Sequence, residues 1–285
     1  MSTISIRQNE ENVLRCQYAA RFCYNRAEVL NTGVWCCCIM AAVLVFLPDS
    51  LPGILQYGLP LSVELLATFL TWRLSVRVSQ ASLFRSYFDA YVFSFDLTEF
   101  SSKIHKIGEL SKKIVRYHQK EATIQLKNTG NDYPPGVKDW YILTDGLSEN
   151  DAIFECQRQN SYWDEKMSKV RKKESIAFFC LFAIIAIMLW RVAHVNSWKL
   201  AVCILGILLK CIERLCVNKK YDTLSTEITG IVQNLERDRT SANIRHLQDK
   251  INERRSLLIL QKNHVHKNKA GEYTIQYEED KELLK

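Results

Sequence analysis

Residues 34–72 read VWCCCIMAAVLVFLPDSLPGILQYGLPLSVELLATFLTW, and the only formal charges in this stretch are Asp49 and Glu64. A second apolar region extends from 176 to about 217, with a turn at residues 194–197 between its two arms. A bilayer crossing needs about 20 apolar residues, and two such runs joined by a turn form a hairpin. The sequence therefore predicts two membrane hairpins.

The four predicted spans differ in quality. Residues 34–47 are 14 residues long and cross a bilayer only if residues 31–33 lie among the headgroups, whereas residues 51–72 are long enough alone. Residues 176–190 end at an arginine that can reach the interface, and residues 200–217 are the weakest span because charged residues interrupt them. A soluble helical bundle with an unusually apolar core is the alternative. A cleaved signal peptide does not fit, because the first 30 residues are polar.

Lysine and arginine predict the orientation, because they gather on the cytoplasmic side of membrane spans. The turn at residues 48–53 has none of them. The flanking segments hold Arg7, Arg15, Arg21, Arg26, Lys169, Arg171, Lys172, Lys173, Lys219 and Lys220. We therefore expect both termini and the middle of the chain in the cytoplasm, with two short turns outside. The formal net charge of +7 reflects this flanking charge as much as any anionic partner.

The expected fold is an all-α membrane protein with four transmembrane helices in two hairpins and long cytoplasmic helical extensions. Its predicted parts are a cytoplasmic amphipathic helix in residues 1–33, hairpin 1 in 34–75, a cytoplasmic helical region in 76–175 with a central loop at 128–147, hairpin 2 in 176–217, and cytoplasmic C-terminal helices and a tail in 218–285.

The helix before each hairpin carries the same spacing of mostly apolar residues. One stripe is Val13, Cys16, Ala20, Cys23, Ala27 and Leu30, and the other, 140 residues later, is Ile153, Cys156, Asn160, Trp163, Met167 and Val170. Steps of three and four place each stripe on one helix face. As a repeat, this predicts two like units in parallel orientation that favour assembly around a pseudo-symmetric axis. Any amphipathic helix shows the same spacing, so that alternative stays open.

Local signals predict further helix boundaries. Residues 76–95 extend the second span, and an amphipathic helix follows from Ile104 to Ile114. Ser148 with Asp151 is typical of a capping box at the start of a helix that continues unbroken into the third span.

Two more signals lie beyond the fourth span. The apolar phase slips at residues 240–243, which predicts a break between two helices. Tyr273, Ile275 and Tyr277 alternate with polar residues, which is typical of a short strand, with a disordered tail as the alternative.

The cysteines are expected to be reduced and structural. Seven of the 10 lie in or beside the apolar spans, where thiols act as small hydrophobes: Cys36, Cys37, Cys38, Cys180, Cys203, Cys211 and Cys216. No Cys-x-x-Cys pair exists, and His264 and His266 have no ligand cluster nearby, so we expect no metal. There is also no phosphate-cradling glycine loop, no Gly-x-Ser-x-Gly and no His-Glu-x-x-His. We therefore expect no catalytic residues, no cofactor and no enzyme activity.

Three charged residues within the spans are candidates for lining a pore. Glu64 is the sharpest, because an ionisable side chain in a bilayer normally faces a bundle interior or a wet cavity, unless it lies near the headgroups. Lys210 and Glu213 are three apart on one helical face and can instead pair with each other. In an oligomer such residues recur as rings, which can set ion preference.

A second cluster is cytoplasmic and combines aromatic rings with cations. Its members are Tyr133, Lys138, Trp140, Tyr141, Arg158, Tyr162, Trp163 and Lys166. Such a set suits a ligand with bases to stack and phosphates to neutralise. A small aromatic core that anchors the loop to the helix explains the same residues and stays open.

Three motifs carry a resemblance to a known family. They are RQNE at residues 7–10, PGVKDWY at 135–141 and CQRQNSYWD at 156–164. In this order, and over essentially its whole length, the chain resembles the bacterial four-transmembrane effectors associated with the SMODS nucleotidyltransferases. The resemblance implies a pore-forming effector of cyclic-oligonucleotide antiphage signalling. A partner synthase senses infection and makes a cyclic nucleotide, and the effector permeabilises the inner membrane and stops growth.

The leading hypothesis is an oligomeric inner-membrane effector activated by a cyclic dinucleotide or oligonucleotide. We expect Lys138, Arg158 and Lys166 to bind phosphate, and Trp140, Tyr141 and Trp163 to stack on bases. A membrane-anchored scaffold that recruits partners without conduction is one rival. A lipid-modifying enzyme is the other, which the missing catalytic cluster disfavours.

Overall fold

The computed structural model describes residues 3–48, 50–131, 135–143, 146–191, 197–258, 260, 269, 272–273, 275–277 and 279. Its helices are α1 (Thr3–Arg7), α2 (Glu11–Val43), α3 (Gly53–Val92), α4 (Ile104–Tyr117), α5 (Gln119–Leu126), α6 (Glu149–Arg191), α7 (Ser197–Leu235) and α8 (Ser241–Arg255), with short 3-10 turns at Leu44–Phe46 and Thr98–Phe100. No strand occurs in the residues described, so the expected all-helical fold is confirmed.

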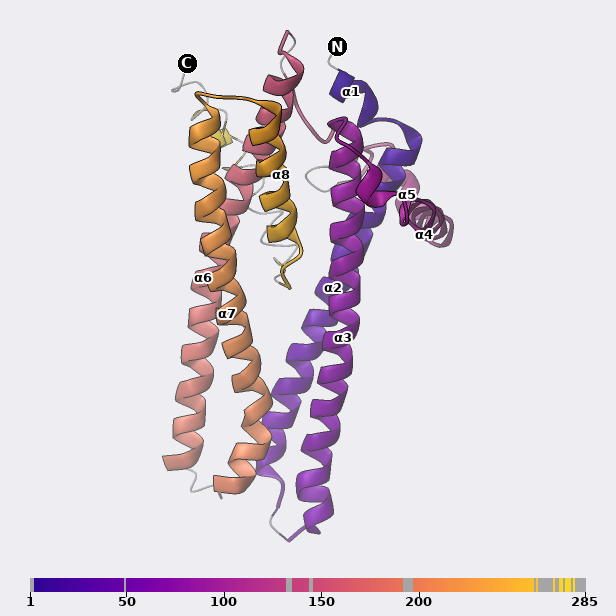
Figure 1. Cartoon of the computed structure of the whole chain (residues 1–285). Helices are drawn as coiled ribbons and strands as arrows, with labels where there is room; N and C mark the ends of the chain where they lie inside the picture. The colour runs from indigo at the N-terminus through magenta and orange to yellow at the C-terminus, as the bar shows by residue number, and fades with distance from the viewer. Residues whose placement is uncertain are drawn as a thin grey trace.

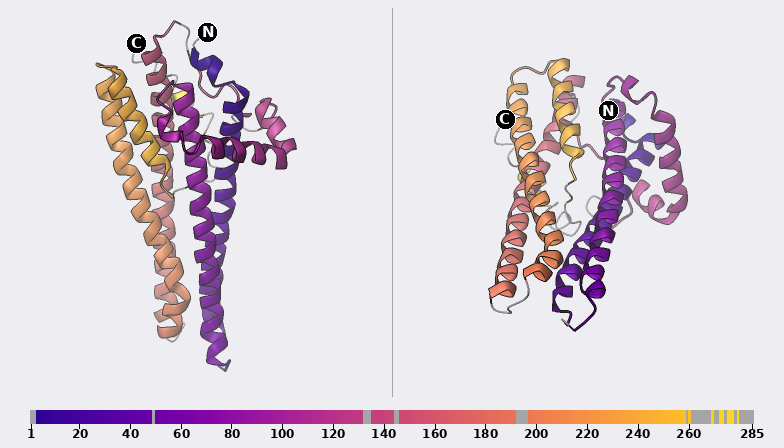
Figure 2. Two further views of the ribbon diagram at one scale, coloured as in Figure 1. Left: turned by 45° about the vertical axis from the view of Figure 1, so that its right-hand side comes forward. Right: turned by 60° about the horizontal axis from the view of Figure 1, so that its bottom comes forward.

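Two long helical hairpins dominate the architecture (Figure 1). Helices α2 and α3 form hairpin 1, and α6 and α7 form hairpin 2. The C-terminal ends of α2 and α6 and the starts of α3 and α7 lie at one end of the molecule, which we call the hairpin end, and α1, α8 and the C-terminal end of α7 lie at the other, the terminal end (Figure 1). Helix α8 folds back against α7, α6 and α3 at the terminal end, while α4 and α5 pack on the outer side of α2 (Figure 2).

The surface of the hairpin end is apolar. Large side chains that face outward there include Ile54, Leu65, Phe69, Trp72, Ile184, Ile187, Leu205 and Leu209. A soluble bundle would bury such residues, whereas lipid solvates them. Three helices are long and apolar enough to cross a membrane: α2 with its 3-10 extension, α3 and α6. The protein is therefore a membrane protein, which decides against the soluble bundle.

The hairpin end also has a small interior between the two hairpins. Its core consists of Val34, Cys37, Cys38, Ala67, Ile204 and Ile207. Trp35 of α2 stacks on Phe178 and Phe182 of α6, with ring centroids 5.8 and 6.3 Å apart. The cysteines here are free thiols that pack as small apolar groups.

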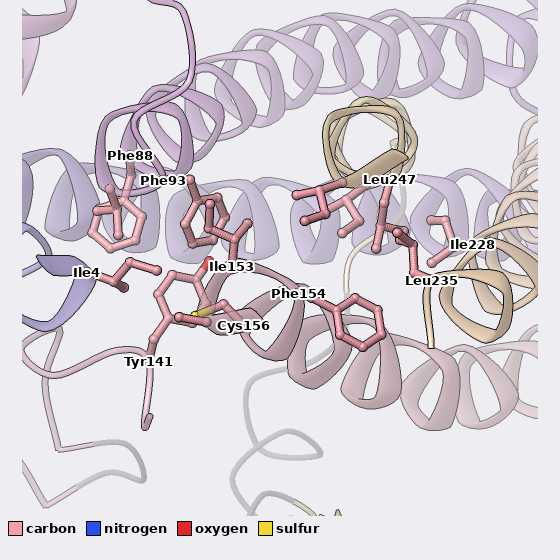
Figure 3. Packing of buried hydrophobic residues seen from close by; sticks show 14 of the residues in the cluster. Ile4, Phe88, Phe93, Tyr141, Ile153, Phe154, Cys156, Ile228, Leu235 and Leu247 are labelled. Carbon is pink, nitrogen blue, oxygen red and sulfur yellow. The ribbon is translucent and has the colours of Figure 1, made fainter. Parts of the chain in front are cut away.

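A larger core at the terminal end joins elements far apart in sequence (Figure 3). Its members include Ile4, Phe88, Phe93, Tyr141, Ile153, Phe154, Cys156, Ile228, Leu235 and Leu247. The two predicted stripes lie on buried faces of α2 and α6: Val13, Cys16, Ala20, Cys23 and Ala27 are buried, as are Ile153, Cys156 and Met167. The terminal core holds α1, hairpin 1, hairpin 2 and α8 together.

The predicted helix boundaries are largely confirmed. Ser148 and Asp151 cap α6 reciprocally, since the Ser148 hydroxyl donates to Asp151 at 2.6 Å and accepts from the Asp151 N–H at 3.2 Å. A break does separate α7 from α8, but it lies at residues 236–240 rather than at the predicted 240–243, because the Thr240 side chain accepts from the Asn243 N–H and caps a helix that begins at Ser241. Helix α3 ends at Val92, three residues before the predicted end at Phe95. Ser94, just beyond the helix, adopts a positive φ of 56°.

The strand considered for the tail is wrong. Tyr273, Ile275 and Tyr277 are helical in the residues described. Two tyrosines four residues apart lie on one face of a helix, and both pack on α6. Tyr273 meets Trp163 edge-on at 6.0 Å, and Tyr277 meets Tyr162 at 5.2 Å. Packing against α6 therefore decided the local structure.

Phe88 tests the terminal core, because this side chain of α3 is completely buried and belongs to the same core as Tyr141 of the central loop. We expect Phe88→Ala to lower the free energy of unfolding by about 3–5 kcal/mol, through lost burial and the cavity that remains. Chemical denaturation of the purified protein in detergent measures this. Tyr117→Ala, at an exposed ring on α4, is the control. Equal effects of the two substitutions would contradict the core assignment.

Candidate functional site

The three family-like motifs converge at the terminal end. The Gln8 side chain donates to the Tyr141 carbonyl at 3.1 Å and accepts from the Tyr141 N–H at 2.8 Å. Asn9 pairs in the same two-way manner with Asp139, through bonds of 2.6 and 3.0 Å. Asn160, in the third motif, donates to the Tyr141 hydroxyl at 3.0 Å. The motif residues therefore hold the N-terminus, the central loop and α6 to one another.

A buried ionic cluster lies behind this junction, and we call it the Asp89 network. It consists of Asp89, Tyr141, Asn160, Gln248 and Arg255. The Asp89 carboxylate accepts from the Tyr141 hydroxyl at 2.6 Å, from Gln248 at 3.0 Å and from Arg255 at 2.5 Å. Asp89 has no exposed surface. The network thus joins α3 of hairpin 1 to the central loop, α6 and α8.

Electrostatics keep this network charged. Burial alone would raise the pKa of Asp89, but the guanidinium groups of Arg255 and Arg85 and the Tyr141 hydroxyl outweigh burial and lower it. Burial and the neighbouring Asp89 charge raise the pKa of Tyr141, so its hydroxyl stays protonated and donates. The ion pair stabilises the fold above the ordinary carboxyl pKa of 3.8, and this contribution is lost as the pH falls through the lower folded value.

The loop residues of the predicted ligand cluster have surroundings that differ from one another. Tyr141 is 2% exposed and belongs to the terminal core. Trp140 is half-buried, with the Arg85 guanidinium carbon 4.1 Å from its ring centroid. Lys138 has an exposed side chain, and its backbone forms two hydrogen bonds with Asn128. Tyr133 lies outside the described residues.

The helical half of the predicted cluster faces the tail. Arg158 pairs with Glu155 at 2.9 Å and lies 5.8 Å from the Tyr277 ring centroid. Lys166 lies over the ring of Tyr162 at 5.0 Å, and Trp163 contacts Tyr273. Residues 158 and 160 differ by about 200° around a helix. Arg158 therefore lies on nearly the opposite side of α6 from Asn160, which contacts Tyr141. The fold does not bring the residues of the predicted ligand cluster together. Its ligand binding stays a prediction.

At the hairpin end, Glu64 of α3 points at α7. Its carboxylate occupies the space next to Gly206, where the Cβ of any other residue would lie. One carboxylate oxygen, Oε1, is buried and has no hydrogen-bond partner in the described part of the chain. Lys210, one turn farther along α7, pairs with Glu213 at 2.8 Å instead. Glu64 thus lies between the two hairpins, and the predicted alternative of a Lys210–Glu213 pair is confirmed.

Two concave regions are charged. A small cavity of about 20 Å³ lies between α2 and α7, lined by Asn31, Trp35, Lys210, Glu213, Arg214, Val217, Leu258 and Leu260. An open groove of about 420 Å³ runs between α2 and α4 and is lined by Glu11, Arg15, Lys112, Val115, Arg116 and Gln119. We call the second one the α4 groove. Over the residues described, no three His, Cys, Asp or Glu side chains are placed to hold a metal ion.

Apolar helical hairpins joined by a polar junction at one end define an integral membrane protein rather than a soluble globular one. Residues 2–260 match the family model described as the SMODS-associating 4TM effector domain, and the chain belongs to this family. It is thus a transmembrane effector associated with SMODS nucleotidyltransferases. No curated protein and no solved structure matches the chain.

Sequence reasoning missed Asp89, Arg255, Gln248 and Arg85. A signal for Asp89 existed, because it is a lone carboxylate in the apolar and aromatic run SYFDAYVF at residues 86–93. Two of its partners, Gln248 and Arg255, could not be found from the sequence. They are more than 150 residues away, and only the folded chain brings them near Asp89.

Asp89→Asn tests the network. Removing one partner of a buried ion pair leaves the other charge uncompensated, so we expect a loss of about 3–5 kcal/mol of unfolding free energy. The double variant Asp89→Asn with Arg255→Gln should lose less than the sum of the two single variants, because both charges are gone. Denaturation in detergent gives these values, with exposed Glu99→Gln as the control. Additive losses would contradict coupling between Asp89 and Arg255.

Proposed function

We propose that this protein is a pore-forming effector of the bacterial inner membrane that a cyclic nucleotide activates. A partner SMODS-type nucleotidyltransferase makes the nucleotide during phage infection. The effector then permeabilises the membrane and stops growth, which is an abortive-infection defence. It has no catalytic role and works as a homo-oligomer. Membership of the SMODS-associating effector family supports this proposal.

In this proposal all four hairpin helices cross the bilayer. Helix α7 is not among the three helices apolar enough by composition, because Lys210, Glu213 and Arg214 lie in its membrane half. Three features support its crossing. It is the antiparallel partner of α6 (Figure 1), its Leu205, Leu209 and Ile212 face outward, and Lys210 is paired with Glu213. Basic residues at the terminal end support a cytoplasmic location of both termini, because lysine and arginine gather on the cytoplasmic side of membrane spans.

The observation that carries the proposal is the Glu64 carboxyl. A carboxyl group in the membrane half costs free energy unless water or a partner satisfies it. In the described chain its Oε1 is buried between α3 and α7 without a partner. A state in which the hairpins separate or assemble into a ring would expose Glu64 to a water-filled path. Ligand binding can favour that state only through a higher affinity for it.

A dye-release assay tests activation. Purified protein in liposomes should release entrapped dye when one of a panel of cyclic dinucleotides and trinucleotides is added, and its particle size should change with that nucleotide. We expect Arg158→Ala to raise the nucleotide concentration needed by about tenfold or more, which is the value of one charge-assisted hydrogen bond. Trp140→Ala should act similarly through lost stacking.

Lys127→Ala is the matched control, since it removes an exposed cation elsewhere in the cytoplasmic part. If no nucleotide triggers release, the proposed function is wrong. If release occurs but Arg158→Ala and Trp140→Ala behave as wild type, only the ligand residues are misplaced.

Glu64→Gln tests the conducting path. A ring of carboxylates favours cations, so we expect the variant to lose cation preference, seen as a reversal potential closer to zero under a salt gradient in planar bilayers. Gly206→Ala should alter conductance in the same assay, because its methyl group displaces the Glu64 carboxylate. Glu236→Gln, at an exposed carboxylate beyond the end of α7, should change neither property.

A scaffold that recruits partners without conduction is the second candidate. The α4 groove favours it, because Arg15, Lys112 and Arg116 present a cationic surface on the outer side of α2. A scaffold predicts that Glu64→Gln leaves toxicity and conductance unchanged.

A further inference from the structure

Two buried arginines surround one tyrosine where α6, α7 and α8 meet. Arg171 of α6 is 5% exposed, and Arg254 at the end of α8 is 1% exposed. Their guanidinium carbons lie 4.2 and 5.6 Å from the ring centroid of Tyr221 on α7. We call Arg171, Tyr221 and Arg254 the arginine cluster.

The arginine cluster and its neighbours carry more positive than negative charge. Arg254 donates to Asp164 at 2.6 Å, Lys172 pairs with Asp222 at 2.7 Å, and Arg214 lies 3.8 Å from Glu174. Arg171 has no ion pair among the residues described. These three pairs are neutral, so the Arg171 charge leaves a net charge of +1.

The donors of these arginines are also incompletely used. Nε and Nη2 of Arg171 and Nε and Nη1 of Arg254 are buried and have no hydrogen-bond partner in the described part of the chain. Buried polar groups in folded proteins are nearly always hydrogen-bonded, and an exception calls for an explanation such as a bound water or ion. Four unused donors on two positive side chains favour an anion.

The geometry of the donors selects the kind of anion. A guanidinium group is a planar fork that binds carboxylates and phosphates through paired hydrogen bonds. Two forks on one tyrosine ring suit a tetrahedral group that can accept several hydrogen bonds. The Tyr221 ring is covered by the two arginines and is not the surface for a base. The donors of this cluster therefore suit the phosphate of a ligand rather than its base.

We infer that the arginine cluster is a binding site for a phosphate group, held by Arg171 and Arg254. This site is distinct from the predicted cluster around Lys138 and Arg158. Its assignment to the phosphodiester of the activating cyclic nucleotide rests on the proposed function, whereas phosphate binding itself does not.

The site is connected to the junction between the hairpins. Arg254 turns towards Asp164 and Tyr221 of hairpin 2, and the next residue, Arg255, binds Asp89 of hairpin 1. A phosphate that draws Arg254 towards α6 and α7 thus acts on the last turn of α8, which also holds the two hairpins together. Binding in one hairpin state and not in the other would shift the population between them.

Thermal unfolding of the full-length protein in detergent tests the site, with sodium phosphate compared against sodium chloride at equal ionic strength. A ligand that binds only the folded state raises the melting temperature. Phosphate should raise the melting temperature of wild type. It should not raise that of Arg171→Gln, because we expect this variant to bind phosphate about ten- to a hundredfold more weakly. Without phosphate, Arg171→Gln should melt at or above the wild-type temperature, because an unpaired buried charge has been removed.

Arg116→Gln is the matched control, since it removes an exposed arginine from the α4 groove and should keep the full phosphate effect. Arg254→Gln should also lose the phosphate effect, but it breaks the pair with Asp164 and lowers the melting temperature by itself. Arg171→Gln is therefore the decisive variant.

Further arms identify the source of the phosphate. A cyclic dinucleotide that acts at lower concentration than inorganic phosphate indicates a nucleotide ligand, whereas a stronger effect of phosphatidylglycerol in the micelles indicates a lipid headgroup. The inference is overturned if none of the three anions stabilises wild type beyond chloride, or if Arg171→Gln keeps the full effect.

These outcomes separate the site from the proposed function. Phosphate stabilisation lost in Arg171→Gln without any nucleotide-triggered dye release would keep the site and reject the function. Dye release that Arg171→Gln leaves unchanged, together with an unchanged phosphate effect, would keep the function and reject the site.

Discussion

The buried ion pair between Asp89 and Arg255 is the constraint on which the terminal end of this protein depends. A carboxylate without exposed surface is tolerated only when cations and hydrogen-bond donors surround it. Meeting that requirement brings together α3, the central loop and α8. The pair therefore does more than add stability, because it determines how the two hairpins are joined at the terminal end.

The family motifs acquire a physical meaning from this arrangement. Gln8 pairs with the backbone of Tyr141, and Asn9 bonds to the carboxylate and the backbone N–H of Asp139. The central loop held in this way positions the Tyr141 hydroxyl to donate to Asp89. The residues that carry the resemblance to the family are thus, in part, the residues that hold the junction together. The alternative of an anchoring aromatic core describes Tyr141 well, since it is fully packed (Figure 3).

The two ends of the molecule use charge in opposite ways. At the terminal end, the buried Asp89 carboxylate is paired with Arg255 and bonded to Tyr141 and Gln248, so the Asp89 network specifies one arrangement of the helices that it joins. At the hairpin end, the Glu64 carboxyl lies against Gly206 with an unused oxygen, beside a small core of apolar groups and thiols. An unsatisfied group favours any state that satisfies it, which makes the contact between α3 and α7 the natural place for a change of state.

The sequence by itself determined the class of protein, because runs of apolar residues report directly on the solvent that they require. Local signals such as the Ser148–Asp151 cap and the slip at residues 240–243 also indicated helix ends to within a few residues, since those interactions are local. Only the tertiary structure decided that Tyr273 and Tyr277 are helical, that Arg158 and Tyr141 lie on different sides of α6, and that Asp89 meets Arg255. Those outcomes depend on packing between segments up to 166 residues apart, which no local pattern encodes.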